Sequence, residues 1–145
     1  MSIRAHVLSI QDNEGDTRLL QQVWGKDSEI KLTCRGTGTL GMEHLQTEDQ
    51  RIPNLILLAG RFPISQMPTL DVLHFLKADP QLKCIPVIVF ASADSDTNHS
   101  FYDAHAACVI EMPHEFDAFT AMLATAKAFW LGVARLPGET QLFYR

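Results

Sequence analysis

The feature that most constrains the fold is a regular alternation of short apolar runs with stretches that have the spacing of an amphipathic helix. Runs with the character of strands occupy residues 5–10, 29–34, 54–59, 86–91 and 107–110. A helical pattern follows each run, at residues 13–24, 40–45, 69–78 and 95–105 and from Glu115 onward. Five strands that each lead into a helix predict a three-layer α/β/α fold built on a doubly wound parallel sheet.

The strand-like runs differ in how strongly apolar they are. Residues 54–59 and 86–91 form essentially continuous apolar runs, which predict central strands covered on both faces. Residues 29–34 alternate apolar and polar side chains, which predicts a strand with one more exposed face. Ligands of such sheets bind beyond the carboxyl ends of the strands. The positions to consider are therefore those just after each strand: Gln11 and Asp12, then residues 59–63, 91–93 and 111–113.

Composition and charge narrow the class of protein. The 145 residues suit one domain, and 46% hydrophobic with 20% charged residues argues against disorder. A net charge of −5 without a basic cluster makes nucleic acid an unfavourable partner. The longest apolar stretch, residues 85–91, is far shorter than the roughly 18 residues of a membrane span, and no signal-peptide pattern stands at the N-terminus. Three cysteines without C-x-x-C spacing favour a reducing, cytoplasmic location.

Several segments, taken together, resemble the receiver domain of response regulators in two-component signalling. Residues 7–16 are similar to the receiver pattern "VLLVEDNPGD", residues 53–59 to "PDLILLD", and residues 76–80 with 85–90 to "LKADP…IPVVVL". The order and spacing of these segments extend the resemblance over about residues 4–131. It implies the flavodoxin-like receiver fold, with strand order 2-1-3-4-5. The last segments, residues 129–131 and 135–137, are similar to stand-alone receivers that partner phytochrome-like histidine kinases.

In this family an aspartate attacks a phosphohistidine while carboxylates hold Mg²⁺, and a lysine and a Ser/Thr hydroxyl bind the phosphoryl oxygens. The resemblance puts Ala59 at the acceptor position, Ala91 at the hydroxyl position and Met112 at the lysine position. Of the acidic pair, which falls on Gln11 and Asp12, one carboxylate remains. Residues with these side chains can neither attack phosphorus nor bind its oxygens, so the resemblance implies a pseudo-receiver that is not phosphorylated.

A shift of the alignment by one residue does not restore the acceptor, because residues 55–62 contain no acid. With Asp12 alone, Mg²⁺ binding is expected to be lost or weak. Asp12 also suits a second role, as an anion near the start of the first helix. Pro113 follows the lysine position, where receivers usually have a cis peptide bond, so we expect Met112–Pro113 to be cis.

Other chemistry-bearing residues favour structural roles. The six histidines lack i, i+4 pairing, so no metal site is predicted, and His105 is expected in a surface turn. The cysteines Cys34, Cys84 and Cys108 are expected to be small buried residues rather than reactive thiols. Arg61 lies at the mouth of the degenerate pocket, where it could bind an anion or simply be solvated. The G-x-G-x-x-G string at residues 36–41 follows the second strand, which favours a flexible turn over a dinucleotide loop.

Two hypotheses for the function follow. The first is a cytoplasmic receiver-like protein, not an enzyme, which acts by contact with a histidine kinase, another receiver or a second copy. The second is a small-ligand-binding protein or enzyme on a flavodoxin-like sheet, which the fold alone permits. The positions after the strands supply no nucleophile with an adjacent base, and this favours the first hypothesis.

The C-terminal residues bear on assembly. The receiver-like domain is expected to span residues 1–131 and a C-terminal extension residues 132–145. Apolar side chains continue past the predicted core, and monomers rarely leave such side chains exposed as a patch. We therefore expect a two-fold homodimer through the last helix and the extension, with Phe129, Trp130, Leu136 and Phe143 at the interface.

Overall fold

The computed structural model describes residues 3–47, 51–92 and 98–138. Its five parallel strands have the order β2-β1-β3-β4-β5 that was predicted. The strands are β1 (Ala5–Ile10), β2 (Ile30–Arg35), β3 (Leu55–Ala59), β4 (Val87–Ser92) and β5 (Cys108–Met112). The helices are α1 (Glu14–Val23), α2 (Gly38–Gln46), α3 (Thr69–Ala78), α4 (Asn98–Asp103) and α5 (Phe116–Lys127), which continues as the π-helical segment η1 (Ala128–Val133).

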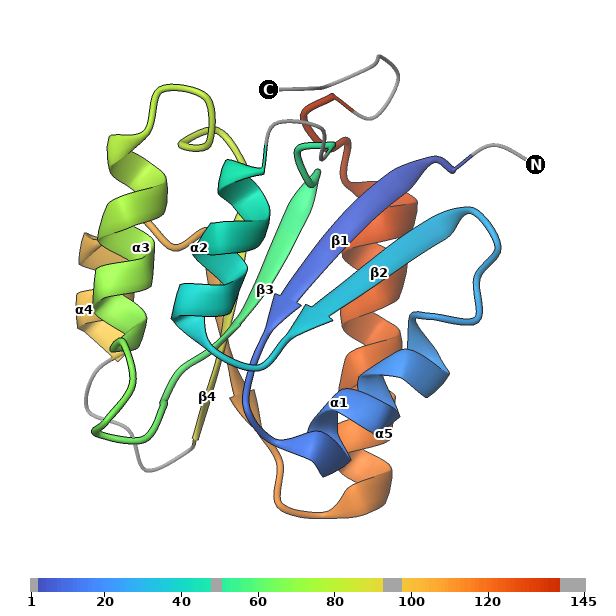
Figure 1. The fold of residues 1–145 in the computed structure, drawn as a ribbon. Coiled ribbons are helices and arrows are strands. Elements are labelled where there is room, and N and C mark those ends of the chain that lie inside the picture. The colour runs from blue at the N-terminus through green and yellow to red at the C-terminus, as the bar shows by residue number, and fades with distance from the viewer. Residues whose placement is uncertain (1–2, 48–50, 93–97, 139–145) are drawn as a thin grey trace.

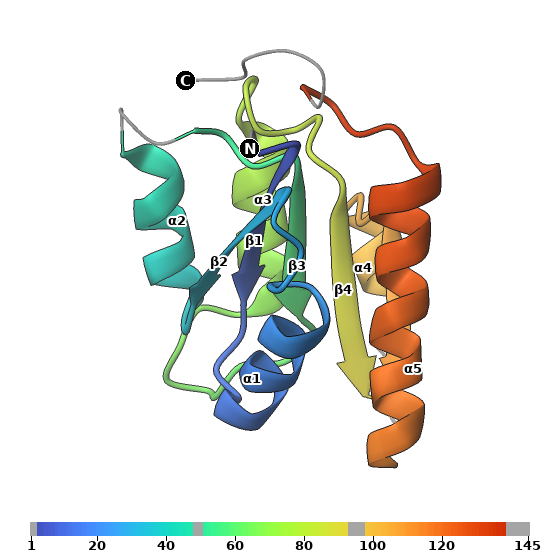
Figure 2. The same cartoon turned by 90° about the vertical axis from the view of Figure 1, so that its right-hand side faces the viewer.

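Two helical layers cover the sheet, as predicted (Figures 1 and 2). Helices α2, α3 and α4 pack on one face, and α1 and α5 on the other. Alternate side chains of one strand enter opposite layers, so that Leu8 and Ile10 of β1 join the first core and Val7 the second. Strands β3 and β4 are buried on both faces, which confirms their central position.

Local contacts set the ends and packing of α1. Asn13 caps its N-terminus, because the side-chain Oδ1 accepts a hydrogen bond from the backbone N–H of Asp16 at 2.9 Å. At the other end, the buried Trp24 donates its indole N–H to the carbonyl of Leu123 at 3.0 Å. This bond joins α1 to α5 across one layer of the fold.

Helix α2 begins earlier than its sequence predicts. Thr37 caps it by accepting the N–H of Leu40 at 3.0 Å, so Gly38 lies inside the helix rather than in a flexible turn. Gly41 explains how close the helix lies to the sheet, because a Cβ there would be 2.6 Å from Cδ1 of Ile10. Because Gly41 has no side chain, the helix can lie this close to the sheet, at a cost in helix propensity of about 1 kcal/mol.

The chain after η1 corrects the expected dimer interface. Leu136 is only 4% exposed and packs in the core between α1, α5 and the sheet, so it is not a surface contact. The next residue, Pro137, accepts a hydrogen bond from Nδ2 of the buried Asn54 at 2.8 Å. In Figure 1 this segment passes over the amino ends of β1 and β3. The segment folds back because Leu136 gains burial in its own subunit; Phe143 lies outside the described residues.

Helix α4 and its neighbours differ slightly from expectation. Its described part is Asn98–Asp103, and residues 95–97 of the predicted helix lie outside the described residues. Strand β5 extends to Met112, two residues beyond its predicted end. His105 lies exposed in the turn before β5 with φ of 71°, which confirms a surface turn and places it in the left-handed region.

Candidate functional site

The residues that the resemblance assigns to a phosphorylation pocket do meet at the carboxyl edge of the sheet. Strand pairing puts Ala59 of β3 beside Phe90, and Ala91 of β4 beside Glu111. Met112 ends β5 opposite Ser92. The candidate positions therefore come from adjacent strand ends, as the parallel topology requires.

The centre of this edge is closely packed. Ala91 is 1% exposed and belongs to the core under α3 and α4. Gly60 donates its N–H to the carbonyl of Phe90 at 2.8 Å, and a Cβ at Gly60 would be 2.9 Å from that oxygen. The carbonyl of Ala59 accepts a hydrogen bond from the hydroxyl of the buried Thr69 at 2.7 Å. At the ends of β3 and β4, the chain therefore presents the methyl groups of Ala59 and Ala91 where a phosphoryl group would need polar side chains.

The expected cis peptide bond at Met112–Pro113 is wrong, because no cis bond occurs in the described residues. Met112 packs against the apolar core on the α1 and α5 side of the sheet. A lysine at this position has to aim an ammonium group at the phosphoryl oxygens. The thioether of Met112 has no such requirement, so the backbone can keep the ordinary trans form.

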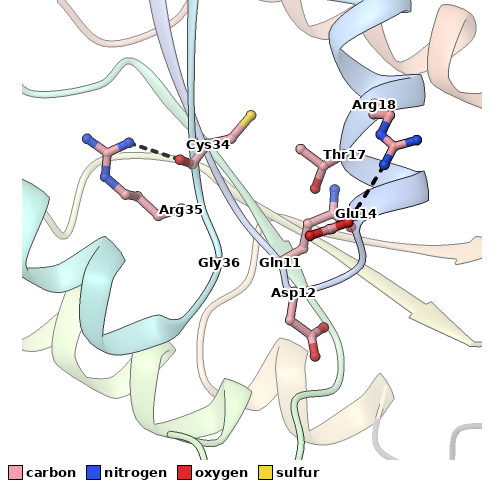
Figure 3. A pocket seen from close by; sticks show the side chains of 8 residues that line it. All are labelled: Gln11, Asp12, Glu14, Thr17, Arg18, Cys34, Arg35 and Gly36. Carbon is pink, nitrogen blue, oxygen red and sulfur yellow. Dashed lines mark hydrogen bonds and ion pairs between the residues drawn. The ribbon is translucent and has the colours of Figure 1, made fainter.

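Asp12 is exposed and lies between two surface hollows. The larger, about 500 Å³, is lined by Gln11, Asp12, Glu14, Thr17, Arg18, Cys34, Arg35 and Gly36 (Figure 3). In Figure 3 the Asp12 carboxylate points away from the two arginines. Arg18 pairs with Glu14 at 3.7 Å, and Arg35 donates to the carbonyl of Cys34 at 2.9 Å.

The smaller hollow lies at the mouth of the degenerate pocket. It has a volume of about 340 Å³ and is lined by Asp12, Arg61, Phe62, Pro63 and Ile64. Arg61 is exposed there, as the sequence predicted. Phe62 is buried, so one cation and one carboxylate stand at the rim of an otherwise apolar loop.

The residues present do not fit a magnesium ion. Mg²⁺ requires a near-octahedral shell of oxygen ligands, usually with more than one carboxylate. Asp12 is the carboxylate that remains of the acidic pair, and Gln11 stands at the other position. Across the part of the chain that the structure describes, no group of three or more His, Cys, Asp or Glu side chains could hold a metal.

The thiols near the sheet are not activated. Burial raises the pKa of Cys34 and of Cys108, which keeps both in the neutral thiol form. Cys84 is exposed, contrary to the prediction that it is buried, because it lies in the turn between α3 and β4.

Sequence reasoning missed Thr17, Arg18 and Arg35 as lining residues of the larger hollow. Arg18 and Arg35 come together through the parallel pairing of β1 with β2, which brings the start of α1 beside the end of β2. The position of Arg35 just after an alternating strand was the signal that could have found it.

Comparison with known proteins provides further findings. No family model matches the chain. The chain is 31% identical over 138 residues to the response regulator Rcp1 of Synechocystis sp., covering 90% of this chain and 92% of that protein. The crystal structure of the Mn(2+)-bound form of Rcp1 matches with a TM-score of 0.84 at 28% identity, over 92% of this chain and 99% of that one. The phosphorylated cyanobacterial phytochrome response regulator RcpA also gives 0.84, at 27% identity over 92% and 98%.

Proposed function

The chain belongs to the response-regulator family, and we propose that within two-component signalling it is a receiver that is not phosphorylated and acts by contact with other proteins. The observation that carries this proposal is the methyl group of Ala59 at the end of β3, where the resemblance places the acceptor aspartate. A methyl group has no lone pair with which to attack phosphorus.

The surrounding positions support the same proposal. The buried methyl of Ala91 offers no hydroxyl, and the thioether of Met112 offers no charge to a phosphoryl oxygen. By contrast, the relative Rcp1 was solved in an Mn(2+)-bound form, and RcpA was solved phosphorylated. With neither nucleophile nor metal ligands, this chain would contribute a binding surface and no catalytic step of its own.

The test is incubation with acetyl phosphate and Mg²⁺, followed by intact-mass spectrometry at neutral pH. We expect no gain of a phosphoryl group, while an active receiver treated in parallel gains one. Ala59→Asp alone is expected to stay unmodified, because Ala91 and Met112 still supply no donor to the phosphoryl oxygens. A phosphorylated wild-type chain would overturn the proposal.

The proposed partners are a histidine kinase, another receiver or a second copy of this chain. For a homodimer the exposed face of α5 and η1 is the best candidate, since Phe129 is 50% and Val133 75% exposed. The ring of Phe129 meets that of Trp130 edge to face, with centroids 5.3 Å apart. These side chains form an apolar patch after the end of the sheet, which a second copy could cover.

Light scattering tests the dimer. We expect Phe129→Asp to convert a dimeric protein to a monomer at tens of micromolar. Ile64→Asp is the matched control, because Ile64 is fully exposed on a different edge of the molecule and should leave the dimer intact. A monomeric wild-type protein would end the homodimer proposal without affecting the loss of phosphotransfer.

The proposed location is the cytoplasm, where histidine kinases present their phosphohistidine. In the described ranges, each helix is too short or too polar to cross a bilayer.

A further inference from the structure

Strand β2 forms one edge of the sheet (Figure 1). Every second residue of this strand is polar. Lys31, Thr33 and Arg35 alternate with residues such as Leu32, which packs toward α1 and α5. The three polar side chains therefore face the α2 layer. Parallel pairing places Lys31 beside His6 of β1 on the same face.

Arg51 and His44 lie close to these residues. We call the whole set the basic strip: the cations Lys31, Arg35 and Arg51 with the imidazoles of His6 and His44. Nη2 of Arg35 lies 3.2 Å from Nδ1 of His44. Burial has the largest effect on the pKa of His6, and together with the charges of Arg51 and Lys31 it lowers this pKa to about 4. Burial, Arg35 and Lys31 likewise lower the pKa of His44. Both imidazoles therefore stand in positive surroundings.

Within the part of the chain that the structure describes, no carboxylate pairs with the cations of the basic strip. In the described ranges of the chain, Lys31, Arg35 and Arg51 form no ion pair, and Nε of Arg51 is buried without a hydrogen-bond partner. Three cations elsewhere have carboxylate partners, Arg4 with Glu29, Arg18 with Glu14 and Lys127 with Asp27. Isolated cations such as Arg61 and Lys83 form no ion pair within the described ranges either. The strip differs from these isolated cations because its charges lie close enough together to act on the same two imidazoles, and such a cluster suits an anionic group.

The geometry of an edge strand narrows the partner. Strand β2 pairs with β1 along one side. On its outer side the N–H of Ile30 already bonds to the carbonyl of Asp27 and the carbonyl of Cys34 accepts from Arg35, so the backbone groups around Leu32 are those that another strand would meet. Side chains at every second position of a strand stand about 6.6 Å apart, twice the rise per residue. Lys31 and Arg35 are separated by two such steps, about 13 Å, so an added strand with carboxylates at every second residue would place one opposite each cation and one opposite Thr33.

We propose that the β2 edge binds an extended acidic segment of a protein partner, with Asp or Glu at alternate residues, by strand addition. Backbone hydrogen bonds would give affinity, and contacts of the carboxylates with Lys31 and Arg35 would give specificity. A peptide is favoured over nucleic acid because the net charge of −5 on the whole chain repels a long polyanion more strongly than a short segment with a few carboxylates. The proposal does not depend on the loss of phosphotransfer at the carboxyl edge.

The test uses the full chain and three labelled peptides in fluorescence-anisotropy titrations. The first peptide alternates Glu with Val or Thr, the second has the same composition with its Glu residues consecutive, and the third is the first with N-methylated backbone amides. We expect the alternating peptide to bind at least about ten times more tightly than either of the others. It alone has both the alternating carboxylates and the backbone N–H groups that can pair with an edge strand. In NMR spectra, the amide signals of residues 31–35 should shift.

Charge reversal provides the matched variants. Lys31→Glu should weaken binding of the alternating peptide by about ten-fold or more, because like charges would then face each other. Lys83→Glu, an equally exposed lysine beside β4, should change it less than about two-fold. Equal losses in both variants, equal binding of the three peptides, or tighter binding of duplex DNA or anionic vesicles would each overturn the proposal.

Discussion

The amino and carboxyl ends of the sheet differ in what their polar groups do. At the amino end, the fully buried Asn54 exchanges hydrogen bonds of 2.8 Å with the backbone of His6 and donates to Pro137. At the carboxyl end, Ala59, Gly60 and Ala91 pack closely without one polar side chain among them. The buried polar contacts of Asn54 therefore lie at the opposite end of the sheet from the positions where the family has its chemistry.

The largest expected effect tests the amino end. Asn54→Ala should lower the free energy of unfolding by about 3 kcal/mol, because it removes bonds to both His6 and Pro137 and leaves buried partners unsatisfied. Urea denaturation measures this loss. Asn13→Ala, which removes an exposed helix cap, should cost only about 1 kcal/mol. If the two variants were equally stable, the hydrogen bonds of Asn54 would contribute no more to stability than an exposed helix cap.

The second effect tests the packing of the carboxyl end. Gly60→Ala should cost about 2 kcal/mol, because the new Cβ would press on backbone atoms of Phe90 and Ala91. Gly36→Ala is the control, since a Cβ at Gly36 meets nothing within 4 Å, and it should leave stability unchanged or slightly higher. Thermal denaturation compares the two. A Gly60→Ala variant as stable as the wild type would mean that the carboxyl end of the sheet can accommodate a further methyl group.

The third effect is the pH dependence contributed by His6. Its pKa is about 4 in the folded chain, below the value of 6.5 expected when unfolded, so the unfolded chain takes up the proton first. The contribution of His6 to stability is thus complete above pH 6.5 and is lost as the pH falls toward 4. Because the side chain is partly exposed, the loss should be no more than about 1 kcal/mol.

Denaturation curves at pH 7 and pH 4.5 check this sign. His6→Gln should reduce the difference in stability between the two pH values. If His6→Gln left the pH dependence of stability unchanged, His6 would not be its source.

The smallest effect concerns the turn before β5. His105 has φ of 71°, a conformation that glycine adopts without steric cost. His105→Gly should therefore raise the free energy of unfolding by about 0.5–1 kcal/mol. His105→Ala keeps the unfavourable conformation and should bring no gain. A loss of stability in His105→Gly would show that the imidazole makes a contribution that outweighs its backbone strain.

Local periodicity predicted most of the fold. All five strands lie within two residues of their expected ends, and the third helix, at 69–78, has its expected bounds. These elements depend on patterns within about ten residues of sequence. The resemblance also brought Ala59, Ala91 and Met112 to one edge of the sheet, although their lack of activity stays a prediction.

The errors share a different physical origin. Burial of Leu136 depends on contacts with elements more than a hundred residues earlier, and the role of Gly41 depends on its distance from Ile10. The sequence also suggested no basic cluster, yet Lys31 and Arg35 share one face of β2, and the fold brings Arg51 close enough to act on the same His6 as Lys31. Long-range packing of this kind leaves no periodic signal, which is why sequence patterns alone missed it.

The contact between Asn54 and Pro137 has a practical consequence for fusion proteins. It fixes the chain at residue 137 to the amino end of the sheet, opposite the degenerate pocket. A fluorescent protein or affinity label joined after Gly138 would therefore start from the opposite end to that pocket. Shortening the chain before Leu136 would instead uncover the α1 and α5 core, so truncated versions should aggregate more readily than labelled full-length ones.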